Sequence, residues 1–92
     1  MIASFRCRET ERIFNGQPSR KFSPIQRAAL RKLTILDAAE NLGQLAGKGN
    51  SLEALKKDHI GQHAIRINDQ YRLCFRWSSP DANDVEIVDY HD

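Results

Sequence analysis

The last third of the sequence alternates apolar and polar residues in two adjacent runs. The runs cover residues 63–67 and 71–77, and only the polar residues Asn68-Asp69-Gln70 lie between them. Such alternation is typical of strands with one buried face, and so short a polar linker predicts an antiparallel β-hairpin. A three-residue loop also fixes which residues of the two strands face each other: Ile67 with Tyr71, Arg66 with Arg72, and Ile65 with Leu73.

This register divides the side chains of the hairpin between two faces of a sheet. The face expected to pack on the core carries Ile65, Ile67, Tyr71, Leu73 and Phe75. The other face is expected to be exposed and carries Ala64, Arg66, Arg72, Cys74 and Arg76. A slip of one residue would place Arg72 among the apolar side chains, so the pattern strongly favours this register.

A long amphipathic helix is predicted to begin at Ser23-Pro24. Serine can cap the first backbone N–H groups of a helix, and proline fits the first helical turn. Gly43, after Leu42, is the predicted end of the helix. The apolar positions recur at spacings of four, four and three, with three further residues widening the stripe: Ile25, Ala29, Leu33 and Leu36, then Ala28, Leu30 and Ala39.

The remaining elements complete a single domain over residues 1–92. They are a first strand at Met1–Phe5, a short helix at Glu9–Phe14 ended by Asn15-Gly16, a possible strand edge at Leu52–Lys56, and a last strand at Val85–Val88 after a turn at 79–83. Helices that come before most of the strands indicate an α+β fold. We expect the N-terminal strand and two helices to pack on one face of a small antiparallel sheet.

Composition supports a soluble cytoplasmic protein. Charged residues make up 28% and hydrophobic residues 40% of the 92 residues, as in ordinary globular domains. The apolar runs are too short for a membrane span, which needs about 20 residues, and the first ten residues do not resemble a signal peptide. Cys7 and Cys74 are far apart in sequence, so we expect two reduced thiols.

Charge and metal-ligand patterns add little about partners. The net charge is only +2. A basic segment without acidic residues precedes Asp37 and suits either phosphate contact or simple solvation: Arg20, Lys21, Arg27, Arg31 and Lys32. His59 and His63 have the spacing of metal ligands, but Gly61 lies between them and no third ligand is evident. We expect neither a metal nor another cofactor.

Lys56, Arg72 and His91 are the functional groups that fall near the exposed face of the predicted sheet. Together they suit metal-free cleavage of RNA, in which a base, an acid and a cation act on one phosphodiester. Glu53 is a further candidate base, and Tyr90 offers a hydroxyl or a stacking surface for a nucleobase. Arg66 and Arg76 are expected to contact phosphate or to be solvated. Each residue also has a structural reading: Lys56 as a surface lysine, His91 as part of a loose terminus, Tyr90 as a packing residue.

Several of these stretches together resemble the HigB toxins of the RelE/ParE superfamily. They are L-E-A-L-K at 52–56, Gly61, HAIRINDQYRLCFRW at 63–77, and VEIVDYH at 85–91. The resemblance covers nearly the whole chain and implies a RelE-like fold and the toxin of a bacterial type II toxin–antitoxin module. Such toxins cleave mRNA in the A site of the 30S ribosomal subunit, without metal, and thereby inhibit translation. They are neutralised by HigA, a helix-turn-helix antitoxin, and reach operator DNA only through the antitoxin complex.

The resemblance assigns catalytic roles to Lys56, Arg72 and His91, with Tyr90 and Asp89 beside the histidine. One position departs from the family, because Glu53 stands where other members have a histidine in the segment L-x-x-L-K. The general base is therefore either Glu53 or His91. Two other functions stay open: a ParE-like toxin that binds DNA gyrase, and a catalytically weak module that only binds its antitoxin. The terminal Asp89-Tyr90-His91 favours the nuclease.

Overall fold

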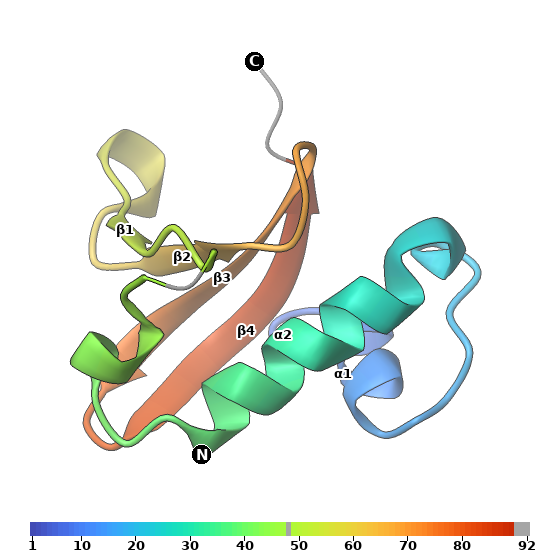
Figure 1. Ribbon diagram of the computed structural model, residues 1–92, viewed down its shortest axis with the longest axis horizontal. Helices are drawn as coiled ribbons and strands as arrows, with labels where there is room; N and C mark the ends of the chain where they lie inside the picture. Colours follow the sequence, from blue (N-terminus) through green and yellow to red (C-terminus); the bar gives the residue numbers. More distant parts are fainter. Residues whose placement is uncertain (48, 90–92) are drawn as a thin grey trace.

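The computed structural model describes residues 1–47 and 49–89, which form two helices packed on a four-stranded antiparallel sheet (Figure 1). The α-helices are α1 (Arg8–Phe14) and α2 (Gln26–Ala38), and the strands are β1 (Glu53–Ala54), β2 (His63–Arg66), β3 (Tyr71–Ser78) and β4 (Asp81–Asp89). Three short 3₁₀ turns connect them: η1 (Ser23–Ile25), η2 (Leu42–Leu45) and η3 (Lys57–His59). The strand order is β1-β2-β3-β4. The α+β fold is as predicted.

The hairpin of β2 and β3 has the predicted register. Arg66 pairs with Arg72 and Ile65 with Leu73, and the N–H of Ile67 donates to the main-chain oxygen of Tyr71 at 3.0 Å. The side chains predicted for the core are buried, apart from the half-buried ring of Tyr71. The pattern was decisive here because one face of each strand is covered by the helices.

The opposite face of the sheet, which neither α-helix covers, is hereafter called the open face. The prediction that all of it is exposed is wrong. Ala64 and Cys74 are buried in a small second apolar cluster with Leu55, and the half-buried Val88 packs against it. Leu55 follows β1, whose pairing with β2 brings it over these two small side chains. Arg66 and Arg72 are half-buried, and Arg76 is exposed.

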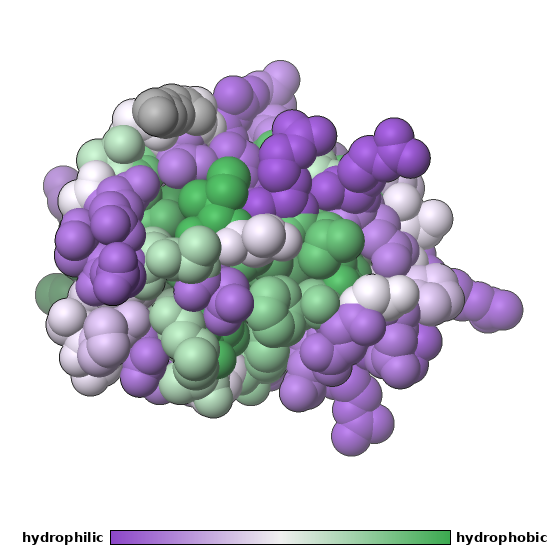
Figure 2. All heavy atoms as spheres, turned by 60° about the horizontal axis from the view of Figure 1, so that its bottom comes forward, coloured by the Kyte–Doolittle hydropathy of each residue, from purple (hydrophilic) through white to green (hydrophobic). Residues whose placement is uncertain are grey.

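The predicted stripe is buried: Ile25 lies in η1, Ala29, Leu33 and Leu36 lie in α2, and Ala39 follows the helix. Leu30, which was expected to widen the stripe, is 37% exposed. Part of the apolar layer around this core reaches the surface, and Figure 2 shows a hydrophobic band between hydrophilic side chains.

Both predicted ends of α2 are wrong. Ser23 does not cap it, because Ser23–Ile25 forms the turn η1 and α2 begins at Gln26 without a side-chain cap. The helix ends at Ala38, since Ala39 is extended (ψ 132°) and turns its side chain into the core. Gly43 instead lies within η2, which is capped by the side chain of Asn41.

The N-terminal segment runs parallel to β4 but forms only two isolated bridges, Ile2 with Ala82 and Phe5 with Val85. The pairing is interrupted because β4 is irregular between these bridges, where Asp84 has a φ of 53°. The N–H of Asp84 there donates to the hydroxyl of Ser4 at 2.9 Å instead of to a ladder partner. The expected first strand is thus an interrupted edge, and β4 itself is longer than predicted.

Candidate active site

The open face is organised in rows that cross the strands. Directly paired residues share a face of a sheet, so the pairing defines one row with a carboxylate at each end: Glu53, Ala64, Cys74 and Glu86. The next row begins with two guanidinium groups: Arg66, Arg72 and Val88. A row with two carboxylates therefore lies beside a row with two guanidinium groups. Within the first row, the small side chains of Ala64 and Cys74 separate the carboxylates.

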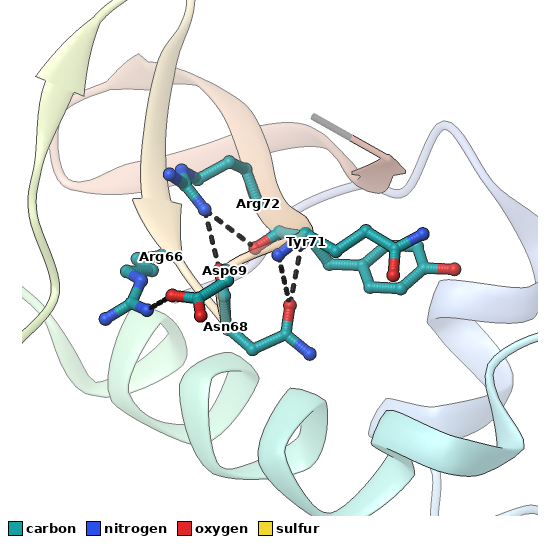
Figure 3. Close-up of polar contacts among 6 residues, drawn as sticks. Arg66, Asn68, Asp69, Tyr71 and Arg72 are labelled. Atoms are coloured by element: carbon teal, nitrogen blue, oxygen red, sulfur yellow. Dashed lines mark hydrogen bonds and ion pairs between the residues drawn. The ribbon is translucent and has the colours of Figure 1, made fainter. Parts of the chain in front are cut away.

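Arg72 is the best-anchored cation on this face. Its Nη1 donates to the main-chain oxygen of Asn68 at 2.7 Å and to that of Tyr71 at 3.3 Å (Figure 3). Both acceptors are main-chain oxygens, and the two bonds orient the guanidinium. Arg66, by contrast, is paired with the carboxylate of Asp69 in the hairpin loop. Of these two arginines, Arg72 is thus the one whose guanidinium is fixed by the backbone of the hairpin.

Glu53 and Glu86 have different surroundings although they belong to one row. Glu86 is half-buried, with one carboxylate oxygen 3.7 Å from Nη1 of Arg6. Glu53 is exposed on the edge strand β1 and forms no ion pair with any residue that the structure describes. Glu53 therefore keeps the solvent access that a proton-accepting carboxylate needs.

The pKa of the Cys74 thiol is shifted by charged groups of the open face. The pKa of this thiol is raised to about 12, chiefly by burial and then by the carboxylates of Glu86 and Glu53, whereas Arg72 acts to lower it. All three charged groups therefore lie near the centre of the open face. The thiol itself stays protonated and is unsuited to nucleophilic chemistry.

Lys56 is exposed and lies beyond the far end of β1, just before η3. The N–H of Leu55 still pairs with Gln62 on the chain entering β2, whereas Arg72 pairs with Arg66 at the other end of that strand. Strand spacings therefore separate the Cα atoms of Lys56 and Arg72 by roughly 15–20 Å. The two residues therefore lie at opposite ends of the paired strands.

The guanidinium of Arg76 interacts with Asp84 and lies close to Gly61. Its Nε lies 3.7 Å from the carboxylate of Asp84, and its guanidinium lies over Gly61, where a Cβ would come within 2.8 Å of Nη1. Gly61 also has a φ of +90°. A residue with a side chain would therefore disturb both the turn and Arg76.

Tyr90 and His91 lie outside the described residues. The last described residue, Asp89, pairs with Tyr71, and its carboxylate accepts a hydrogen bond of 3.0 Å from Nε2 of Gln70. In Figure 1 β4 accordingly ends beside the β2–β3 loop. The described part of the chain thus ends beside Tyr71, the residue that precedes Arg72.

Sequence reasoning missed a partly buried polar connection between α2 and β2 through the buried Asn50. Nζ of Lys32 donates to Oδ1 of Asn50 at 2.8 Å, and the main-chain oxygen of Asn50 accepts from the N–H of Arg66 at 2.6 Å. Burial lowers the pKa of Lys32, and the charges of Arg31 and Arg66 lower it further. Asn50 lies in the Gly-rich stretch 46–51, and the composition of this stretch indicates only a flexible loop.

His59 and His63 do not form a metal site with other described residues, among which no group of three potential ligands occurs. His59 is exposed on η3, whereas the half-buried ring of His63 stacks on Phe75 with centroids 6.2 Å apart. Within residues 1–47 and 49–89, no helix is long and apolar enough to cross a membrane.

Comparison with known proteins identifies the family. A family model described as the RelE-like toxin HigB of type II toxin–antitoxin systems matches residues 3–91. Toxin HigB-1 of Vibrio cholerae serotype O1 is 36% identical over 80 residues, which cover 84% of each chain. An uncharacterized protein of Haemophilus influenzae is 30% identical over 66 residues, or 71% of this chain and 65% of that protein.

A solved structure shows the same fold at low sequence identity. The YoeB–YefM complex from Staphylococcus aureus contains a chain that matches with a TM-score of 0.58 and 19% identity, over 100% of this chain and 99% of that one. This likeness concerns the fold alone, whereas the family follows from the match that spans residues 3–91. The chain therefore belongs to the HigB-like family of RelE-like toxins of type II toxin–antitoxin systems.

Proposed function

We propose that this toxin is a ribosome-dependent endoribonuclease that cleaves mRNA without a metal ion and so inhibits translation. The observation that carries the proposal is the anchored guanidinium of Arg72 on the open face, in the row next to the exposed carboxylate of Glu53. A fixed cation beside a solvent-accessible carboxylate suits phosphodiester cleavage, in which negative charge and a proton must be handled together.

In the proposed reaction, the 2′-oxygen of one nucleotide attacks the adjacent phosphorus. The new 2′-O–P bond forms as the bond from phosphorus to the 5′-oxygen breaks. Arg72 stabilises the charge that gathers on the non-bridging oxygens, because its planar donors can hold two of them at once. A base takes the proton of the 2′-hydroxyl and an acid protonates the leaving 5′-oxygen; Glu53 and His91 are our candidates for these two roles.

The other candidate residues would hold the RNA around the scissile bond. Tyr90 offers a ring on which an unstacked base can lie. Lys56 would hold phosphate or assist proton transfer from its position beyond β1. Arg66 and Arg76 would supply further phosphate contacts to messenger or ribosomal RNA, in competition with their pairing to Asp69 and Asp84.

We further propose that a HigA-like helix-turn-helix antitoxin neutralises the toxin in the cytoplasm, and that operator DNA is reached only through their complex. The support is the family itself, whose members are toxins of type II toxin–antitoxin systems. The fold neighbour in the YoeB–YefM complex was also solved together with a second protein.

Induction in bacterial cells followed by transcript-end mapping tests the proposal. Wild-type protein should arrest growth and create new 5′ ends within translated messages, and His91→Ala and Arg72→Ala should greatly reduce both effects. Arg8→Ala, which removes an exposed arginine of α1, is the matched control and should behave as wild type. Growth arrest with intact messages and inhibited gyrase supercoiling would instead support the ParE-like function.

A further inference from the structure

We propose that Asn68 is a positioning residue for Arg72: its side chain holds the hairpin turn in the form that presents two main-chain oxygens to the guanidinium. The expected effect on catalysis rests on the proposed function, whereas the contact between the turn and Arg72 does not. Asn68 is half-buried in the loop between β2 and β3, and its side chain accepts from the backbone of this loop and of the first residue of β3.

The side chain of Asn68 closes the turn. Its Oδ1 accepts hydrogen bonds from the N–H groups of Gln70 at 2.9 Å and Tyr71 at 2.8 Å (Figure 3). Asparagine favours such local bonds because its short side chain mimics a backbone carbonyl. The N–H of Ile67 and that of Asn68 both donate to the oxygen of Tyr71, at 3.0 and 3.3 Å. One side chain thus fixes both the loop and the first residue of β3.

The backbone held in this way is the backbone that contacts Arg72. The main-chain oxygens of Asn68 and Tyr71 accept from Nη1 of Arg72 at 2.7 and 3.3 Å. In Figure 3 the amide of Asn68 points away from the guanidinium, so the side chain affects Arg72 only through the turn. Loss of the Oδ1 acceptor would let the loop relax and would move both carbonyl groups.

A displaced guanidinium should matter more for the rate of cleavage than for the binding of RNA. A misplacement of about 1 Å can lower a rate on the order of 10²-fold, whereas a charge in solution still attracts phosphate. We therefore expect Asn68→Ala to lower the single-turnover rate constant by about 10- to 100-fold. The concentration of toxin that gives half-maximal rate should change little.

A graded series of variants separates positioning from general damage to the fold. Aspartate retains the acceptor, serine offers a weaker one and alanine none, so the rates should fall in the order Asn, Asp, Ser, Ala, with Asn68→Asp near wild type. The matched control is Asn41→Ala, which removes a similar cap bond of 3.0 Å at η2, outside the open face. Its rate should be that of wild type. A rate for Asn68→Asp as low as for Asn68→Ala would overturn the proposal.

The signal of the Arg72 guanidinium in the NMR spectrum of the toxin alone provides a readout independent of cleavage. The signal is assigned by its loss in Arg72→Ala. It should shift from its wild-type position in Asn68→Ala and stay in place in Asn68→Asp and Asn41→Ala. An unchanged signal in Asn68→Ala would refute the positioning role. If the signal shifts as expected but wild-type toxin cleaves no message, the proposed function fails while the contact between the turn and Arg72 stands.

Discussion

Glu53 and Glu86 occupy opposite ends of one row across the sheet, on either side of the buried pair Ala64 and Cys74. The two carboxylates are chemically identical but differ in surroundings, because Glu86 lies 3.7 Å from Arg6 and Glu53 is exposed without an ion pair among the described residues. This pair offers a matched test of which carboxylate takes part in proton transfer.

Glu53→Gln should lower the cleavage rate, and Glu86→Gln should leave it within about twofold. Glutamine keeps the shape of the side chain but cannot accept the proton of the 2′-hydroxyl, and loss of a general base typically costs at least 10²-fold. The measurement is the single-turnover cleavage rate on ribosomes that carry a defined message. Equal rates for wild type and Glu53→Gln would assign the base role to His91.

The thiol of Cys74 should be unreactive in the folded protein. It is 1% exposed, and burial raises its pKa to about 12, so almost no thiolate is present at about pH 8. A colorimetric thiol titration of native protein should therefore detect at most Cys7, which is half-buried, and should detect both cysteines after unfolding. Reaction of both thiols in the native state would contradict the burial of Cys74.

The same thiol should reduce stability at alkaline pH. Below pH 9.0 it is protonated in both states, whereas between 9.0 and about 12 the unfolded chain loses its proton and the folded chain keeps it. The free energy of unfolding should then fall with rising pH by up to about 1.4 kcal/mol per pH unit from this group. Denaturant titrations of wild type and Cys74→Ala between these pH values should show a steeper decline for wild type; parallel declines would refute the assignment.

Asn50→Ala should destabilise the fold by about 1–3 kcal/mol, since it removes one buried and one partly buried hydrogen bond and leaves their partner groups without the Asn50 side chain. The side chain of Asn50 accepts from Lys32 at 2.8 Å and donates to the main-chain oxygen of Leu45 at 3.2 Å. The measurement is the free energy of unfolding in urea. Asn41→Ala, at an exposed cap, should cost no more than about 1 kcal/mol. Equal losses in the two variants would mean that the buried network contributes no special stability.

The hairpin and the stripe of α2 were predictable because each has one face on the same core. Alternation placed Arg66 opposite Arg72, and the spacing of Leu33 and Leu36 marked the buried side of the helix. Both signals come from hydrophobic burial, the strongest constraint that a sequence pattern carries.

Features that depend on contacts between distant segments were not predictable. The burial of Cys74 requires Leu55 to fold over it from β1, and the early end of α2 follows from burial of Ala39. Asn68 was recognisable as a turn residue, but its connection to Arg72 runs through main-chain oxygens that no side-chain pattern records. The role of Asn50 likewise depends on partners from α2 and β2.

The central claim is that Arg72 stabilises the charge that develops during cleavage of mRNA on the ribosome. The most direct measurement compares wild type, Arg72→Ala and the control Arg8→Ala on purified ribosomes that hold a defined message with an empty A site. We predict that Arg72→Ala lowers the single-turnover rate by about 10²–10³-fold, with thermal unfolding close to that of wild type, and that Arg8→Ala cleaves normally. A folded Arg72→Ala variant that cleaves at the wild-type rate would contradict the account.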